Sequence, residues 1–247
     1  MTLSRRAVLR WVAAAAAATG GSTLTGRSAA ATPQAPQRSG IATASARRSP
    51  VPPPSAPPEP VLSANGWPVD AASNSGGCVW SRPVAGTGFD VDVAIGDAEV
   101  VLVHVVRRFH YEIDTLLPGE VVGFKRPGQV SGYETDHASG TAVDIRPGHY
   151  PPGVRGGFTA QEVEVIRDIL AECDGVVRWG GDLEAPDEAH FWIGVPPGDE
   201  RLRTVVARLR AWTHSPHRGA GVVPDVRAAD RRRRARALER RQRGHGR

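Results

Sequence analysis

A proline-rich stretch sets the limit on where this chain can fold. Residues 32–60 are rich in Pro, Ser and Ala and contain few large apolar side chains, so they cannot bury a hydrophobic core. The prolines of residues 52–60 favour an extended polyproline II conformation, which predicts a semi-rigid spacer. The foldable region is therefore predicted to span residues 61–213, which is about the size of one domain.

Residues 1–31 have the pattern of an export signal. A twin-arginine pair, Arg5 and Arg6, precedes an apolar run over residues 11–18, and small residues suited to cleavage follow at 28–31. The apolar run is too short to span a bilayer comfortably. We therefore expect export by a twin-arginine signal and a working place in the cell envelope or outside the cell. A retained membrane anchor and a chance alanine-rich helix are the alternatives.

Positive charge is concentrated at the C-terminal end. Residues 218–247 contain eleven Arg and three acidic residues, whereas the whole chain carries a net charge of only +5, so the remainder is acidic. Residues 214–247 are predicted to be a disordered or partly helical tail. This tail is either simply solvated or bound to an anionic surface such as wall polymer or lipid headgroups. Because no aromatic residue is interleaved with the arginines, nucleic acid is not expected as a partner. A monomer is expected.

The chain has two cysteines, Cys78 and Cys173, which are far apart in the sequence. Export would allow a disulfide between them, and two separately buried thiols fit the sequence equally well. Neither cysteine has a Cys or His neighbour at a short metal-ligand spacing. A role in metal binding is therefore not predicted for them.

Hydrophobic periodicity predicts an α+β fold with a small, mostly antiparallel sheet flanked by helices. Helices are predicted where apolar residues recur every three or four positions, and Thr159 with Glu162 forms a capping box for the second one. Residues 65–88 are predicted to be loop-rich. The predicted helices are residues 97–117, 159–173 and 199–212, and the predicted strands are residues 89–93, 120–124, 142–145, 175–181 and 190–195.

Three candidate metal ligands occur in and after residues 131–145. His137 and Asp144 stand seven residues apart in this segment, and His190 follows downstream. Two imidazoles and one carboxylate, with a fourth position left for water, are the ligand set of a catalytic zinc site. The small residue Gly140 would let the backbone between the first two ligands turn tightly. The sequence therefore predicts a Zn²⁺ site on the sheet.

Residues 131–145 resemble a family signature. The segment Thr135 to Asp144 is similar to the S/T-x-H-x-x-G-x-A-x-D motif of the zinc D-alanyl-D-alanine carboxypeptidases and L-alanyl-D-glutamate endopeptidases. Residues 187–191 resemble the acid-x-x-His-Phe motif of the same family, and the resemblance covers residues 120–195. It implies that His137, Asp144 and His190 bind zinc.

The resemblance also implies that Asp187 is the general base, three residues before the last ligand. Glu188 is an alternative base, because a residue two positions before His190 would share its strand face. Thr135 stands where a serine is commoner and keeps the hydroxyl group.

Family members hold the substrate carboxylate with a basic residue before the first motif. Lys125 and Arg126 occupy that region and are the candidates, together with Thr135, for contact with substrate. Bidentate recognition of a carboxylate favours Arg126. A solvent-exposed basic turn without a role in binding is the alternative.

The sequence thus predicts an exported, zinc-dependent peptidase. Its expected substrates are the stem peptides of peptidoglycan, cut at an amide bond next to a D-amino acid, by either carboxypeptidase or endopeptidase action. The main alternative is a catalytically weak or inactive module that binds wall peptide and is tethered to the envelope by the basic tail. In a third interpretation the tail makes the protein a surface adhesin, with the domain as a scaffold.

Overall fold

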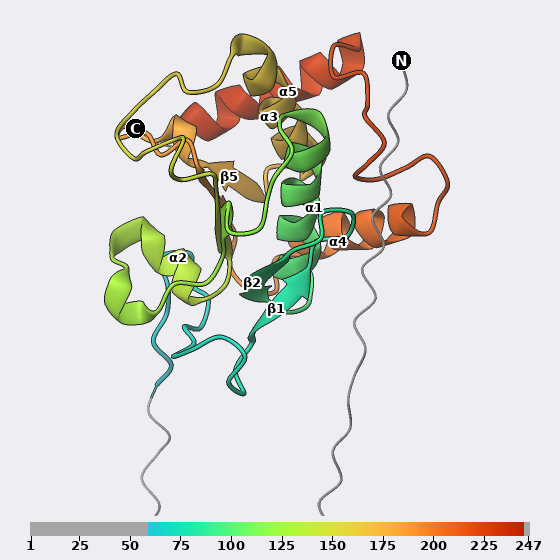
Figure 1. The fold of residues 1–247 in the computed structure, drawn as a ribbon. Coiled ribbons are helices and arrows are strands. Elements are labelled where there is room, and N and C mark those ends of the chain that lie inside the picture. The colour runs from blue at the N-terminus through green and yellow to red at the C-terminus, as the bar shows by residue number, and fades with distance from the viewer. Residues whose placement is uncertain (1–58, 245–247) are drawn as a thin grey trace, which may run out of the picture. The chain divides into compact units, whose positions relative to one another are not determined.

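The computed structural model describes residues 59–244, which belong to one compact unit. The predicted export signal, and the predicted linker up to residue 58, lie outside the described residues. Two antiparallel sheets and five α-helices make up this unit, so the α+β prediction is confirmed (Figure 1). Within residues 59–244, no helix is both long and apolar enough to cross a bilayer.

The larger sheet has four antiparallel strands in the order β3-β4-β6-β5. These strands are β3 (Val121–Val122), β4 (Ala142–Ile145), β5 (Val177–Trp179) and β6 (His190–Ile193). The smaller sheet pairs β1 (Val79–Pro83) with β2 (Asp90–Ala94). The helices are α1 (Asp97–Glu112), α2 (Thr135–Ala138), α3 (Ala160–Glu172), α4 (Glu200–Thr213) and α5 (Ala229–Gly244).

The two faces of the larger sheet have different environments. Val143 and Ile145 on β4, with Phe191 on β6, are buried in a hydrophobic cluster that includes apolar side chains of α1, α3 and α4. Successive side chains of a strand point to opposite faces, so Asp144 and His190 point away from this core. The sheet therefore has one face for packing and one face on which polar groups can be brought together.

Helix α1 ends earlier than the predicted residue 117. The Nδ1 atom of His110 accepts a hydrogen bond from the backbone N–H of Leu116 at 3.0 Å, and the N–H of Asp114 donates to the carbonyl of Phe109 at 3.1 Å. These bonds take the N–H groups that would have continued the helix. The apolar stripe predicts the face of α1 correctly, but a side-chain acceptor sets its end.

Strand β1 lies in the segment that we expected to be loop-rich. Of its five residues only Val79 is buried, and Pro83 ends it. This short edge strand lacks the alternation of apolar and polar residues that identifies strands in a sequence. Its pairing with β2 therefore depends on contacts that the local pattern does not contain.

The basic C-terminal segment is part of the domain, which corrects the predicted boundary at residue 213. Helix α5 packs against α3 and buries Ala235, Leu238 and Gln242. The Nε2 group of Gln242 donates a hydrogen bond to the carbonyl of Val177 at 2.9 Å. The three buried positions form a narrow stripe at i, i+3 and i+7 among the arginines. The composition of the segment is dominated by arginine and does not reveal this stripe.

The two cysteines are not joined. Both thiols are free, with Cys78 exposed and Cys173 fully buried at the end of α3. Burial raises the pKa of the Cys173 thiol to about 12, so this side chain is neutral and behaves as a small apolar residue. The disulfide is thus not formed in this structure, and the alternative of two buried thiols holds for Cys173 but is wrong for the exposed Cys78.

Candidate metal centre

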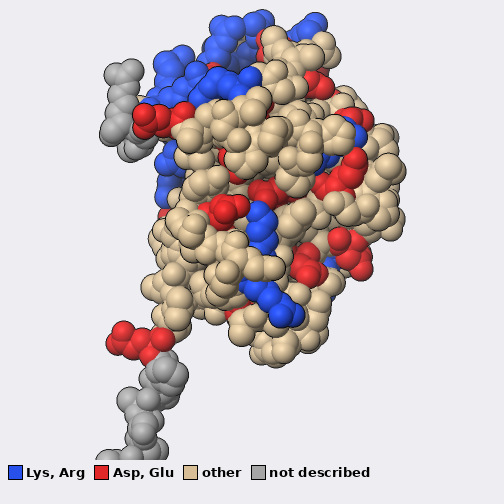
Figure 2. All heavy atoms as spheres, turned by 60° about the vertical axis from the view of Figure 1, so that its left-hand side comes forward, with Lys and Arg blue, Asp and Glu red and all other residues tan. Residues whose placement is uncertain are grey.

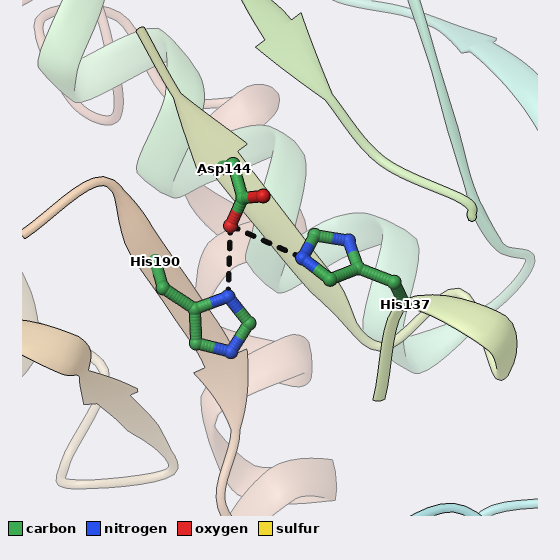
Figure 3. A group of neighbouring side chains, drawn as sticks. All are labelled: His137, Asp144 and His190. Carbon is green, nitrogen blue, oxygen red and sulfur yellow. Dashed lines mark hydrogen bonds and ion pairs between the residues drawn. The ribbon is translucent and has the colours of Figure 1, made fainter. Parts of the chain in front are cut away.

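His137, Asp144 and His190 lie together on the polar face of the larger sheet (Figure 3). Asp144 on β4 is directly opposite His190 on β6 in the antiparallel pairing, which places the two side chains on the same face. His137 reaches them from α2, the short helix that precedes β4. All three side chains are buried, and their ligand atoms lie within 4.8 Å of one another. The predicted ligands are thus brought together on the sheet.

The hydrogen bonds of His137 define which atom it offers to the centre. Its Nδ1 atom lies 2.5 Å from the carbonyl oxygen of Gly123, which can only accept a hydrogen bond. Nδ1 therefore carries a proton, and Nε2 lies 3.1 Å from Oδ1 of Asp144. A protonated Nε2 donates a hydrogen bond to this oxygen. In the neutral ring Nε2 is an acceptor that faces a second acceptor, and a metal ion between the two atoms would remove their repulsion.

His190 is oriented by packing as well as by its bond to Asp144. Its Nδ1 atom lies 2.8 Å from Oδ1 of Asp144, while its Nε2 atom is buried without a hydrogen-bond partner among the described residues. The ring meets Tyr133 edge to face at 5.2 Å and stacks on Trp192 at 5.1 Å between ring centroids. Oδ1 of Asp144 thus contacts one ring nitrogen of His137 and one of His190.

Asp144 stays ionised at neutral pH. Burial alone would raise the pKa of this carboxyl group, but hydrogen bonds and positive charge from His137 and His190 outweigh burial and hold the pKa well below its usual range. The second oxygen, Oδ2, accepts a hydrogen bond from Nζ of Lys125 at 2.7 Å. The centre therefore contains a fixed negative charge that can attract a cation.

Of the two basic candidates, Lys125 adjoins the centre. Its ammonium group also contacts Oε1 of Glu134 at 3.1 Å. Burial lowers the pKa of Lys125, but the carboxylates of Asp144 and Glu134 raise it more, so the side chain stays charged. Arg126 is exposed at the start of a short 3-10 turn. Bidentate geometry favours Arg126 in the sequence, but in the structure Lys125 is the cation that contacts the centre.

Two glycines let the chain approach closely enough to form the centre. Gly140 connects α2 to β4 with a φ of +66°, and a Cβ atom there would lie 2.5 Å from the backbone nitrogen of Ala94. At Gly123, whose carbonyl holds His137, a Cβ atom would lie 2.1 Å from the carbonyl oxygen of Asp92. The smaller sheet is thus packed directly against the backbone that carries the ligands.

Thr135 has its hydroxyl group occupied within the protein. The hydroxyl accepts a hydrogen bond from the N–H of Ala64 at 2.9 Å and donates one to the carbonyl of Gly132 at 2.7 Å. The next residue, Asp136, is buried and accepts from the N–H of Asn65 at 2.9 Å, and burial raises its pKa to about 6. These bonds hold the start of α2 in place, so the structure gives Thr135 a positioning role.

The two neighbouring acids, Asp187 and Glu188, have different surroundings. Asp187 is buried, and its Oδ2 atom accepts a hydrogen bond from the hydroxyl of Tyr133 at 3.0 Å. Burial and the negative charge of Asp144 raise its pKa. Both oxygens of Glu188 accept backbone N–H groups, from Gly156 at 2.9 Å and Gly157 at 2.8 Å. Asp187 thus shares its surroundings with the centre, whereas Glu188 anchors the loop before α3.

Tyr133 is a site residue that the sequence argument did not identify. It is 37% exposed, it contacts the ring of His190, and its hydroxyl holds Asp187. The available signal was its place four residues before His137, about one helical turn away. That spacing alone could not show that the hydroxyl reaches an acid on another segment.

Comparison with protein-family models, with curated proteins and with solved structures finds no match to this chain. The fold and the geometry therefore define the class by themselves. The domain is an α+β unit with a buried His–Asp–His group on one face of an antiparallel sheet, and this group could bind a metal ion.

Proposed function

We propose that this protein is a metal-dependent peptidase whose centre is formed by His137, Asp144 and His190. The observation that carries the proposal is the meeting of three ligand atoms within 4.8 Å, beside a buried acid, Asp187, with a raised pKa. An acid with a perturbed pKa next to a candidate metal centre is typical of sites that transfer protons.

The donor set suits zinc. Two imidazole nitrogens and one carboxylate oxygen are a usual ligand set of zinc in catalytic sites. When the His137 ring is neutral, a cation between its Nε2 atom and Oδ1 of Asp144 would remove the repulsion of these two acceptors. Zinc held by these three residues would supply the Lewis acidity needed for hydrolysis of an amide. The carbonyl oxygen of Gly123 contributes to this arrangement, because its hydrogen bond with Nδ1 fixes the tautomer of His137.

Asp187 is the preferred general base. Its raised pKa makes the carboxylate a stronger base, which suits a group that takes a proton from water and passes it to the leaving amine. The hydroxyl of Tyr133 holds the carboxyl group in a fixed direction. Glu188 is less suited, because two backbone N–H groups already occupy both of its oxygens.

Lys125 is the preferred partner for the negative charge of a substrate. It is half-buried beside Asp144, whereas Arg126 is exposed. The substrate class rests on the sequence: the resemblance of residues 135–144 and 187–191 to the wall peptidases and the predicted export signal both favour peptidoglycan stem peptides. We therefore propose cleavage next to a D-amino acid in such a stem.

The test is hydrolysis of defined stem peptides by the purified full-length protein, with products identified by mass spectrometry. We expect a product shortened by a terminal D-alanine, or one cut between L-alanine and D-glutamate. A zinc chelator should abolish this product, and added Zn²⁺ should restore it. If the stems bind but no chelator-sensitive product forms from any of them, the protein is a wall-peptide-binding module and the proposal fails.

A further inference from the structure

Seven of the eight arginines of α5 fall into two groups that the sequence does not distinguish. Arg231, Arg232 and Arg243 form ion pairs with carboxylates of α3 and of the turn after β5, and Arg234 pairs with Asp230 within the helix. The first three arginines join α5 to the rest of the domain, and the pair of Arg234 with Asp230 lies along the helix itself. These four arginines carry much of the positive charge in this part of the molecule.

Arg233, Arg236 and Arg240 form the second group, here called the outer arginine row. All three are exposed, and within residues 59–244 none of them has an ion pair or a side-chain hydrogen bond. Their spacing of i, i+3 and i+7 places them on one face of α5, opposite the buried Leu238. The row therefore faces solvent with its charges uncompensated.

Such a row costs stability, because like charges three or four residues apart on a helix repel one another. Figure 2 shows Lys and Arg gathered over the end of the molecule at which α5 lies in Figure 1. The guanidinium groups present forked donors that match the geometry of phosphate oxygens. A polyanion bound along the row would remove the repulsion, so the arrangement favours an anionic partner.

The shape of the surroundings favours a flexible polymer over a flat surface. On a different flank of α5 from the row, Arg234 lines a cavity of about 620 Å³ together with Arg208, Trp212 and Arg218. Arg218 has no ion pair or side-chain hydrogen bond within the part of the chain described. A bilayer could not follow the surface into this recess, whereas a polymer strand could.

The composition of α5 points the same way. Its sequence, ADRRRRARALERRQRG, has no aromatic residue on which bases could stack, and its only large apolar residue, Leu238, is buried against the domain. Insertion into a membrane interface needs an outward apolar face. Binding of single-stranded nucleic acid relies on stacking platforms. Neither is provided by the outer arginine row.

We propose that the outer arginine row, together with Arg218 at the cavity on the other flank of α5, binds a flexible phosphodiester polymer without bases. This goes beyond the proposed peptidase activity and does not depend on it. The polymer would hold the protein near its place of work through charge, while the centre on the sheet remains free.

The test measures binding of the full-length protein to poly(glycerol phosphate) by titration calorimetry at several salt concentrations. Replacing Arg233, Arg236 and Arg240 together with Gln should weaken binding about a hundredfold at ~0.1 M salt, and should lower the slope of log K against log salt by about 2, since each lost phosphate contact contributes about 0.7. Adding Arg218→Gln should weaken binding about fivefold more. The melting temperature should not fall, because these side chains make no ion pairs within residues 59–244 and their replacement relieves the repulsion along the row.

The matched control replaces three exposed arginines of α4, Arg201, Arg203 and Arg210, with Gln. This control removes the same charge and should bind the polymer as the wild type does. Equal weakening in both triple variants would overturn the proposal, since net charge alone would then explain binding. So would the absence of binding, or tighter binding to phosphatidylcholine–phosphatidylglycerol vesicles or to single-stranded DNA of matched charge.

Discussion

Asp187 and Glu188 are adjacent in the sequence, yet their carboxyl groups meet different partners. Asp187 contacts the hydroxyl of Tyr133 and feels the charge of Asp144, whereas Glu188 accepts two backbone N–H groups from the loop before α3. Two backbone donors hold the carboxyl group of Glu188 in place. The difference between the proposed proton carrier, Asp187, and the loop anchor, Glu188, therefore lies in their hydrogen-bond partners and not in their position in the motif.

This difference predicts the outcome of two matched amide substitutions. Asp187→Asn should lower kcat on a stem peptide by about a hundredfold or more, because general acid–base groups contribute about 10²–10⁴ to the rate. Glu188→Gln should keep kcat within about tenfold and should instead lower the melting temperature, since it weakens the loop anchor. Steady-state kinetics and thermal melting of both variants check this. Loss of turnover in Glu188→Gln alone would reverse the assignment.

The candidate ligands could be predicted from the sequence, whereas the contacts that hold them in place could not. His137, Asp144 and His190 carry a pattern of residue types and spacings that indicates a metal site. The tautomer of His137 depends on the carbonyl of Gly123, and the fixed start of α2 depends on Asn65. These are contacts between segments far apart in the chain. Their partners are backbone atoms or common polar residues, so nothing in the local pattern identifies them.

Helix α3 agrees with its prediction to within one residue at each end. Thr159 caps it and Glu162 completes the capping box, so local residues alone fix where the helix begins. For α1 and β1 the local pattern was not enough. The end of α1 depends on a bond from Leu116 to His110, and β1 forms only by pairing with β2. Elements are predictable from the sequence where their limits are set by neighbours in the chain.

A buried network of charges joins α1, α3 and α5. Arg108 of α1 is almost completely buried and contacts Glu112, Asp168 and Glu172, and Arg231 of α5 contacts the last two of these acids. Two cations are thus shared among three carboxylates, with His104 also bonded to Glu172. Buried charges are tolerated only when paired in this way. The network explains how an arginine-rich helix can pack on the domain.

The network predicts how stability depends on pH. Burial would raise the pKa of Glu172, but His104 and Arg108 lower it to about 2, from an ordinary value of 4.5. A depressed pKa stabilises the fold above pH 4.5, and this stabilisation is lost as the pH falls toward 2. Glu172→Gln should therefore reduce the free energy of unfolding at pH 7 by about 2 to 3 kcal/mol.

Urea denaturation at pH 7, 4.5 and 3 would measure this effect. The difference in unfolding free energy between wild type and Glu172→Gln should shrink below pH 4.5, because the wild-type carboxyl group then loses its advantage. Glu184→Gln, at an exposed position, is the matched control and should change little at any pH. A difference for Glu172→Gln that stays constant down to pH 3 would contradict the account of the network.

In the molecule as a whole, the sheet separates two tasks. One face packs on the helices to form the core, and the other carries the His–Asp–His group. Figure 1 shows α5, which supplies the outer arginine row, along the top of the described unit, and α2, which supplies His137, below it on the left. The proposed hydrolysis and the proposed polymer binding therefore use separate surfaces. Variants of one can be tested without disturbing the other.

The central claim is that His137, Asp144 and His190 form one metal-binding centre. The most direct measurement is the zinc content of the purified full-length protein, determined by mass spectrometry of the metal after dialysis. We predict about one zinc ion per chain in the wild type, which is the metal stoichiometry expected of a single catalytic site. The single variants His137→Ala and His190→Ala should lose it, and His149→Ala, at an exposed histidine outside the centre, should keep it. Zinc content that is unchanged in the His137→Ala and His190→Ala variants would contradict the account.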